Sequence, residues 1–494
     1  MITFIIGLVI LFVGAAIYGS FCERIMKPNA SFKTPAIKSQ DFMDFVPMNK
    51  WRNCLIELLN IAGTGPVLGP IQGILFGPIA FLTIPIGCVI GGAFHDYMSG
   101  MISIRNNGEQ MPALVRRFLG GGVYKVYNVF VCFLMLLVGV VFIYTPGDLF
   151  VSHILGGDVS TLNSQVVTVY SVILIYYFLA TLFPIDKIIG RVYPIFGAIL
   201  LLSAIGIFFG LFINGYPLKE VWDTGIADVH PFGDHFIPMF FVTVACGIVS
   251  GFHSTQATLI ARSVENETHG RLVYYNTMIA EGFIAMSWAG AAMGAVGIGI
   301  ATEENLFKIP AVVVGIIAKD MLGGIGGMVA ILGVIVLAIT SGDTALRSLR
   351  LMMGDALNDL LRARKGSKTK KKIRTVPLAI SILSVVAFVL WYAKVNASGF
   401  ALLWRYFSWA NETIAVFAFA MIAVYMIKNN MPYLMAVIPG TFYMYMVSTY
   451  ILHAPIGFGL NYTLSYILAA VCSALYVVAI VKFGKSSAVS RKLR

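Results

Sequence analysis

Long apolar segments alternate with short polar connections along the whole chain, and this pattern predicts a polytopic α-helical membrane protein. A helix needs about 20 mostly apolar residues to cross the hydrocarbon core of a bilayer, and the sequence offers thirteen such segments. The expected spans are approximately 2–21, 53–76, 79–103, 125–147, 164–184, 192–213, 237–260, 273–300, 325–349, 376–395, 404–428, 432–453 and 461–482.

Positive charge gathers in every second connection between these spans. Of the 35 Lys and Arg residues, 30 lie in alternate connections, which the positive-inside rule assigns to the cytoplasm. These connections are 22–52, 104–125, 185–191, 261–272, 347–376, 428–431 and the tail from Lys482. We therefore expect a multi-pass protein of a bacterial plasma membrane, with its N-terminus outside and its C-terminus in the cytoplasm.

Two of the expected spans contain a stretch that loosens a helix. The first is Asn60–Pro70 (Asn-Ile-Ala-Gly-Thr-Gly-Pro-Val-Leu-Gly-Pro) and the second is Ile248–Gln256 (Ile-Val-Ser-Gly-Phe-His-Ser-Thr-Gln). A helix broken at bilayer depth exposes backbone groups that lipid cannot satisfy, so such breaks persist where they line a cavity or bind something polar. Paired breaks in two halves of a chain indicate the substrate site of an inverted-repeat transporter.

Unusual residues recur at a nearly constant interval. Gly63 and Gly251 are 188 positions apart, while Asp96 and Glu281, each a lone acid in the following span, are 185 apart. We therefore predict a LeuT-like five-plus-five inverted repeat with two broken helices, because five spans per repeat force the second repeat to insert upside down. The expected division is 1–52 (first helix and cytoplasmic loop), 53–213 (first repeat), 214–236 (external loop), 237–428 (second repeat, with the basic loop 347–376) and 429–494 (two helices and a basic tail).

The residues of the breaks are candidates for substrate binding. Unwound backbone at the first break offers carbonyls to a cation and N–H groups to a carboxylate; a proline-kinked helix that packs through its glycines is the alternative. In the second break, His253 can shuttle a proton or donate to an anion, or hold a structural hydrogen bond. The candidates are Gly63, Thr64, Gly65, Pro66, Gly69, Ser250, Gly251, His253, Ser254, Gln256 and Asn411.

Three acids inside the spans are further candidates, namely Asp96, Glu281 and Glu412. Ionisable residues within a membrane are costly and mark functional sites. Asp96 and Glu281 are therefore candidates for a proton-coupling carboxylate, and a hydrogen bond that ties helices together is the alternative for each.

Hydroxyl and carboxyl oxygens near 340 offer a different route to ion coupling. Thr340, Ser341 and Asp343 supply the hard oxygen ligands that cations such as Na⁺ prefer. Ser and Thr also bond back to carbonyls of their own helix. The sequence thus leaves H⁺ and Na⁺ open as coupling ions; we favour H⁺, with Glu281 as its leading carrier.

Composition narrows the class of protein. The chain is 58% hydrophobic and 12% charged, with a mean hydropathy of +0.85, whereas charged residues make up about a quarter of a soluble domain. The net charge of +12 and the run Arg362–Arg374 fit loops that face anionic lipid headgroups, not nucleic acid. The six cysteines form no CxxC pair, which argues against a metal site or disulfides and favours packing.

Several blocks resemble the carbon-starvation (CstA) family of bacterial inner-membrane proteins, which are described as peptide or pyruvate transporters. These blocks, which extend from about residue 45 to 420, are Ile61–Pro70, Asp96 with Ser103–Gly108, Ser250–Gln256, Met278–Phe283 and Thr340–Arg350. The resemblance implies the inverted-repeat fold of the amino acid–polyamine–organocation superfamily and a role when carbon runs low. The chain resembles a shorter branch, and it has Ala410-Asn411-Glu412 where longer members have Ser-Asn-Gln.

These observations together predict a secondary transporter that imports a small carboxylate nutrient, such as pyruvate, an amino acid or a short peptide, by cation symport. The sequence contains no P-loop and no HExxH pair, so we expect neither ATP drive nor an enzyme, and no cofactor or bound metal. A transporter-like nutrient sensor and a sodium-coupled peptide transporter are the alternatives. The expected partners are the substrate and membrane lipids, and the oligomeric state stays open.

Overall fold

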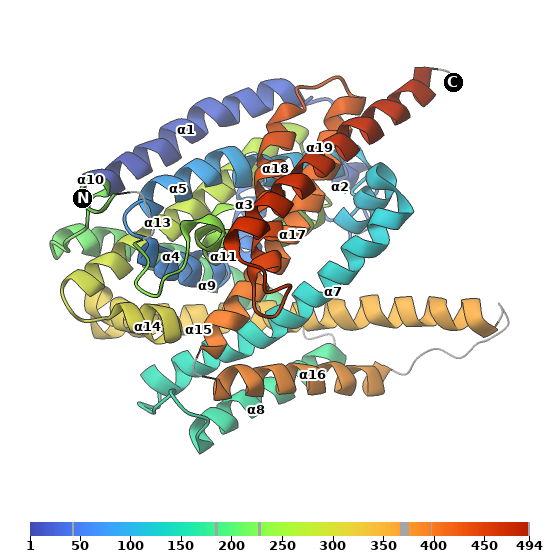
Figure 1. Cartoon of the computed structure of the whole chain (residues 1–494). Helices are drawn as coiled ribbons and strands as arrows, with labels where there is room; N and C mark the ends of the chain where they lie inside the picture. The colour runs from blue at the N-terminus through green and yellow to red at the C-terminus, as the bar shows by residue number, and fades with distance from the viewer. Residues whose placement is uncertain (42–43, 183–185, 226–228, 366–374, 397, 493–494) are drawn as a thin grey trace. The chain divides into compact units, whose positions relative to one another are not determined.

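In the part of the chain that the structure describes, every named secondary-structure element is a helix, and two isolated β-bridges lie in the connections. The computed structural model describes residues 1–494 except 42–43, 183–185, 226–228, 366–374, 397 and 493–494 (Figure 1). The α-helices are α1 (Ile2–Met26), α2 (Pro35–Lys38), α3 (Lys50–Ile61), α4 (Gly65–Gly73), α5 (Ala80–Gly87), α6 (Ala93–Arg105), α7 (Met111–His153), α8 (Ser164–Leu182), α9 (Asp186–Ile213), α10 (Val221–Thr224), α11 (Phe236–Ile248), α12 (Gly251–Ile260), α13 (Asn276–Gly297), α14 (Glu303–Lys308), α15 (Pro310–Lys365), α16 (Thr375–Val395), α17 (Gly399–Lys428), α18 (Leu434–His453) and α19 (Tyr462–Lys492).

The number of membrane spans is close to the expected number but lower. Eleven helices in the described part of the chain are long and apolar enough to cross a membrane, and the bent pair α3–α4 makes twelve when it counts as one span. The expected span 192–213 is represented among the described residues by a shorter apolar helix, Gly197–Ile213. The protein is therefore a multi-span helical membrane protein with eleven to twelve candidate spans.

Two expected cytoplasmic loops contain more helix than the sequence suggested. The loop expected at 104–125 holds the start of α7, which turns at Gly120 (φ 87°, ψ 170°). The loop expected at 347–376 holds the end of α15, a helix that turns at Gly323 (φ 72°, ψ 177°). Glycine permits this left-handed φ at little cost. Most of the basic run 362–374 lies outside the described residues.

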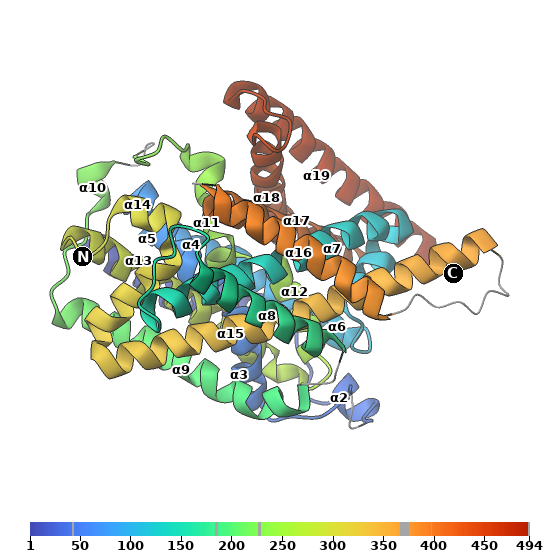
Figure 2. The same cartoon turned by 90° about the horizontal axis from the view of Figure 1, so that it is seen from below.

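The helices form two compact units, and each unit combines segments from distant parts of the sequence. The first unit contains Met1–Asn128, Leu211–Ile298 and Ser408–Arg494, and the second contains Val129–Gly210 and Gly299–Phe407. In the first unit, α18 packs along α19 as a hairpin (Figure 2). In the second unit, α8, α15 and α16 pack against one another.

Polar anchors hold both ends of α1 in the first unit. At its N-terminal end, Glu220 accepts hydrogen bonds from the backbone N–H of Ile2 and Thr3, each 2.8 Å long. Burial would raise the pKa of Glu220, but bonds from the amino terminus and Thr3 hold that pKa at about 2. At the other end, Arg105 donates to the carbonyl of Met26 (2.7 Å) and to the carboxylate of Glu267.

A buried ion pair lies within the second unit. The Lys394 Nζ atom is 2.8 Å from both carboxylate oxygens of Asp148, and the two side chains are about 2% exposed. Tyr170 donates its hydroxyl to Asp148 (2.6 Å), and the Tyr144 ring lies 4.6 Å from the ammonium group. Both charges are thus satisfied, which a buried ion pair requires if it is to be stable.

Candidate functional site

The first break separates α3 from α4. Helix α3 ends at Ile61, α4 begins at Gly65, and their axes differ by 52°. The chain therefore leaves the helical path at Ala62–Thr64, within the stretch that the sequence singled out. The hydroxyl of Thr64 is buried and has no hydrogen-bond partner among the described residues.

The second break consists of two extended residues between α11 and α12. Val249 has φ −154° and ψ 142°, and Ser250 has φ −142° and ψ 128°. Asn411 of α17 braces this break, because its Oδ1 accepts from the Phe252 N–H (2.9 Å) and its Nδ2 donates to the Ser250 hydroxyl (2.9 Å) and the Cys246 sulfur (3.1 Å). Asn411 thus supplies partners that the interrupted helix cannot.

The two breaks come together around Cys246, in the last turn of α11. A Cβ atom on Gly65 would lie 2.8 Å from the Cys246 sulfur and 2.3 Å from its Cβ, so α4 and α11 approach closely only because Gly65 has no side chain. The start of α12 is equally tight, since a Cβ on Gly251 would lie 2.5 Å from the Asn411 carbonyl oxygen and 2.6 Å from the Ala415 nitrogen. Both glycines therefore serve close packing between helices.

His253 links two buried acids of the first unit. Its Nδ1 lies 3.2 Å from Asp96 Oδ2, and its Nε2 lies 3.5 Å from Glu281 Oε2. The other oxygen of Asp96 is 2.8 Å from His95 Nδ1. All four side chains are 0–1% exposed. The imidazole of α12 thus bridges α6 and α13, and each of its nitrogens faces a carboxyl group.

Glu57 is a further buried acid, which the sequence analysis passed over. It lies in α3, one turn before the first break, is 0% exposed, and has no hydrogen-bond partner for either carboxylate oxygen among the described residues. Asp96 and Glu281 lie within electrostatic reach of it. The signal that singles out Asp96 and Glu281, a lone acid in an apolar span, applies equally to Glu57.

The remaining candidates divide between the two units. Ser254 is buried and donates to the Gly251 carbonyl (2.7 Å), whereas Gln256 is half-buried. In the second unit, Thr340 donates to carbonyls of its own helix at 3.0 Å, and Asp343 accepts from Tyr176 at 2.6 Å. The candidates Gly63, Pro66 and Gly69 lie in or beside the first break in the first unit, and Ser341 lies in α15 in the second.

The cluster around His253 does not have the form of a metal site. In the described part of the chain, no group of three or more His, Cys, Asp or Glu side chains is placed to hold a metal ion. The imidazole stands between the two carboxyl groups and contacts both, so these side chains do not converge on a common point. Their arrangement suits the transfer of a proton along the row of acids and imidazoles.

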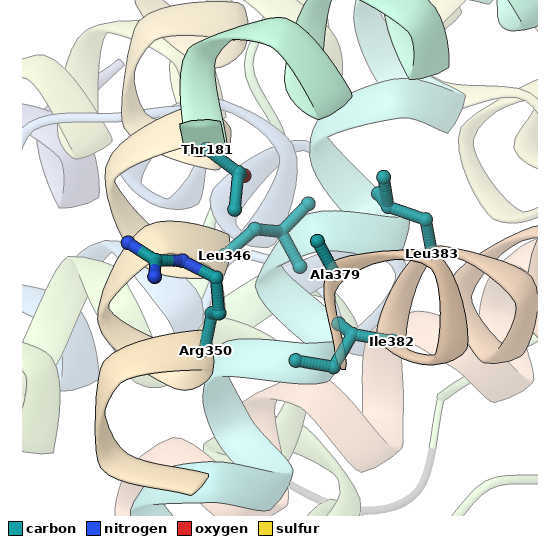
Figure 3. A pocket seen from close by; sticks show the side chains of 6 residues that line it. All are labelled: Thr181, Leu346, Arg350, Ala379, Ile382 and Leu383. Atoms are coloured by element: carbon teal, nitrogen blue, oxygen red, sulfur yellow. The ribbon is translucent and has the colours of Figure 1, made fainter. Parts of the chain in front are cut away.

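A separate hollow lies in the second unit, between α8, α15 and α16 (Figure 3). Its wall is mainly apolar, with the guanidinium group of Arg350 and the buried hydroxyl of Thr181 as its polar members. The lining residues are Thr181, Leu346, Arg350, Ala379, Ile382 and Leu383. None of them is a substrate or ion-coupling candidate from the sequence.

The fold is that of a transporter. The chain resembles the manganese transporter of Eremococcus coleocola with a TM-score of 0.58 and 9% sequence identity, over 90% of this chain and 97% of that one. The chain also matches the family model for carbon starvation protein CstA over residues 1–157, 145–298 and 303–450. It therefore belongs to the CstA family, a family of membrane transporters and not of enzymes.

Relatives of this chain span a wide range of similarity. An uncharacterized membrane protein of Haemophilus influenzae is 39% identical over 348 residues, which cover 62% of this chain and 92% of that protein. The peptide transporter CstA of Campylobacter jejuni is 24% identical, over 56% of this chain and 47% of the transporter. The pyruvate/proton symporter BtsT of Escherichia coli is 23% identical, over 53% and 45%. The chain thus aligns with about half the length of these two transporters.

Proposed function

We propose that this protein is a proton-coupled secondary transporter that imports a small carboxylate-bearing nutrient across the bacterial plasma membrane. The observation that carries the proposal is the buried bridge from Asp96 through His253 to Glu281. The relatives described as peptide transporters and as a pyruvate/proton symporter support the substrate class and the coupling ion.

A five-plus-five inverted repeat is part of this proposal. The bent pair α3–α4 corresponds to the interrupted pair α11–α12, and each is followed by a span that contains a π-helical turn, at Cys88–Gly92 and Arg271–Tyr275. Each half then has a short helix that turns at a left-handed glycine, Gly120 or Gly323, before the next span. The same irregularities in the same order support a repeat.

The composition of the two units supports the same relationship. The first unit takes the broken helix and the following span from each proposed repeat, and the second unit takes the third and fourth spans from each. The fifth spans differ, because 192–213 lies mostly in the second unit and 404–428 lies mostly in the first. In inverted-repeat transporters, alternating access is largely the movement of one such bundle against the other around the substrate site. Each of the two units contains helices from both proposed repeats, which is the composition that this mechanism requires.

The bridge gives a physical route from helix movement to proton transfer. His253 belongs to α12, the second part of a broken helix, while its two acid partners belong to α6 and α13. An imidazole gains or loses a proton according to the groups that face it. Movement of α12 would therefore change both carboxyl contacts of His253 at once and couple the proton to the position of the helix.

Glu281 provides the sharpest test of proton coupling. Labelled pyruvate, alanine and alanyl-alanine are first screened for uptake into proteoliposomes with H⁺ and Na⁺ gradients imposed separately. Glu281→Gln should keep exchange of the transported compound across the sealed membrane and lose its accumulation under a pH gradient. The exposed Glu265 gives a matched control, since Glu265→Gln should accumulate substrate normally.

The opposite pattern identifies sodium as the coupling ion. If Glu281→Gln still accumulates substrate, and Thr340→Val abolishes accumulation under a Na⁺ gradient, proton coupling through the His253 bridge is wrong. Loss of exchange as well as accumulation in Glu281→Gln would assign Glu281 to substrate binding or folding, and not to coupling.

A further inference from the structure

The hollow of the second unit holds two polar side chains that the proposed transport mechanism does not use. The Thr181 hydroxyl and the Nε atom of Arg350 are buried, and neither has a hydrogen-bond partner among the described residues. Figure 3 shows the guanidinium group and the hydroxyl on the side of the hollow away from α16. A buried donor without a partner costs free energy, so a ligand with negatively charged acceptor oxygens would stabilise this arrangement.

The charge around Arg350 is positive and not balanced by an acid. Among the described residues, no carboxylate pairs with Arg350, and the charged side chain within its electrostatic reach is Arg347, which has the same sign. The two arginines are three positions apart, so they share one face of α15. Arg347 donates to the Ala180 carbonyl at 2.8 Å, next to Thr181. This bond offsets the repulsion that the last carbonyls of α8 would exert on an anion.

The hollow lies near the ends of its three helices, beside a strongly basic connection. Thr181 is the last residue but one of α8, and Arg350 lies four residues before the end of the candidate span Pro310–Gly354. The stretch 351–374, which leads from there to α16, contains eight Lys or Arg residues and two Asp residues. The positive-inside rule assigns this connection to the cytoplasm, and basic clusters at that surface attract anionic lipids.

The shape of the hollow favours a lipid over a soluble anion. Its empty volume is about 160 Å³, it is only partly enclosed, and four of its six lining residues are apolar. Only 33% of the apolar window of α8 and 28% of that of α16 are buried, so both helices present apolar faces to the bilayer. The bilayer holds headgroups at high local concentration beside these faces, whereas a soluble phosphate would depend on the two polar groups alone.

We propose that this hollow binds the phosphate of an anionic phospholipid of the cytoplasmic leaflet. The planar guanidinium group of Arg350 pairs with the phosphate charge, and Thr181 donates its hydroxyl to a phosphate oxygen. The acyl chains lie along the exposed faces of α8 and α16. A lipid held in this way ties the end of α8 to α15 and α16, and it stabilises the second unit whatever compound the protein transports.

The first test compares lipids that differ in net charge. Delipidated protein in a neutral detergent is titrated with phosphatidylglycerol or with zwitterionic phosphatidylcholine, and native mass spectrometry gives the dissociation constant of the first bound lipid. Phosphatidylglycerol should bind at least about tenfold more tightly, as one charge-assisted hydrogen bond implies. It should also raise the thermal midpoint, because a ligand of the folded state stabilises that state. Glycerol 3-phosphate at the same concentration should leave the midpoint unchanged.

Variants test the two residues themselves. Arg350→Gln should weaken phosphatidylglycerol binding about tenfold or more, and Thr181→Val, which keeps the shape and removes the hydroxyl, about twofold to tenfold. The matched control is Arg24→Gln, because Arg24 is exposed at the end of α1 and also belongs to a connection expected in the cytoplasm. If Arg350→Gln does not yield folded protein, Thr181→Val and the comparison of lipids still decide.

Every other outcome counts against the inference. It is wrong if the two lipids bind equally, or if folded Arg350→Gln or Thr181→Val binds phosphatidylglycerol like the unmutated protein. Equal losses in Arg350→Gln and Arg24→Gln would mean that lipid responds to the overall surface charge and not to this hollow. A midpoint that rises as much with glycerol 3-phosphate would assign the hollow to a soluble phosphate and overturn the lipid as its occupant.

Discussion

Four acids of the first unit are 0% exposed, and their surroundings differ sharply. Asp96 contacts His95 and His253, and Glu281 lies 3.5 Å from His253 without a hydrogen bond to either of its oxygens. Glu57 and Glu412 have neither a hydrogen bond nor an ion pair among the described residues. Burial of an unpaired carboxylate costs several kcal/mol, and loss of one partner from a buried pair costs about 3–5 kcal/mol. Removal of the charge should therefore lower the stability of the protein at an acid that has a partner, and should leave it unchanged or raise it at an acid that has none.

We expect Asp96→Asn to destabilise the protein and Glu57→Gln to leave its stability unchanged or to increase it. The first variant keeps one acceptor oxygen where Asp96 has two, so it loses the contact with His95 at 2.8 Å or the contact with His253 at 3.2 Å. The second variant relieves an uncompensated charge. Thermal unfolding in detergent, followed by tryptophan fluorescence, measures both midpoints under the same conditions. A loss of midpoint in Glu57→Gln as large as that in Asp96→Asn would mean that Glu57 has a structural partner.

The individual acids and histidine were predictable from the sequence, but their contacts were not. An ionisable residue in an apolar span is conspicuous, which is how Asp96, Glu281 and His253 were found, and the same criterion applied strictly would have added Glu57. Asp96 and His253 are 157 positions apart. Only the packing of α12 against α6 decides that these side chains meet.

At the level of elements, the two helix breaks are held by neighbouring helices and not by their own residues alone. Glycine, proline and clustered polar residues weaken a helix locally, so the sequence located both breaks to within a few residues. Nothing in the sequence indicates that Asn411, which belongs to another helix, forms hydrogen bonds with the Phe252 N–H and the Ser250 hydroxyl at the second break. Gly251 was assigned to substrate binding from its sequence context, whereas the structure places it against α17.

Gly251→Ala should therefore disturb packing at the second break. Its new methyl group would meet backbone atoms of Asn411 and Ala415 at about 2.5 Å, so α17 must shift. Overpacking of this kind costs about 1–3 kcal/mol. Gly121→Ala is the control, because no atom lies within 4 Å of the added carbon. Thermal midpoints and counterflow rates should both fall for Gly251→Ala alone. Equal behaviour of the two variants would show that α12 does not depend on this contact.

The Asp148–Lys394 pair should behave as a coupled unit within the second unit. Asp148→Asn alone leaves a buried ammonium group without a counter-charge and should cost about 3–5 kcal/mol in unfolding free energy. Combining it with Lys394→Met removes both charges, so the double variant should be less destabilised than the sum of the single ones by about 0.5–3 kcal/mol. Additive losses in denaturant unfolding would contradict the pairing.

The sequence analysis missed this pair because it ended the span at 147, whereas α7 continues to His153.

At the scale of the whole molecule, the distribution of positive charge and the number of spans together predict which connections face the cytoplasm. The expected spans alternate across the membrane, and 30 of 35 Lys and Arg residues fall in alternate connections. The positive-inside rule assigns those connections to the cytoplasm. The count of eleven or twelve long spans reaches thirteen only when the bent pair α3–α4 and the shorter helix Gly197–Ile213 are both included.

Cysteine labelling from each side of the membrane tests this orientation. Asp223 and Glu265 are both exposed. They lie in connections that the charge pattern assigns to opposite sides of the membrane. In a variant without the six native cysteines, Asp223→Cys should react with an impermeant maleimide in intact cells, and Glu265→Cys should react only after the membrane is opened. The interrupted pair α11–α12 lies between these two positions, so their labelling reports whether that broken helix crosses the membrane. If both cysteines react from the same side, the broken helix does not span, and the proposed repeat loses its second half.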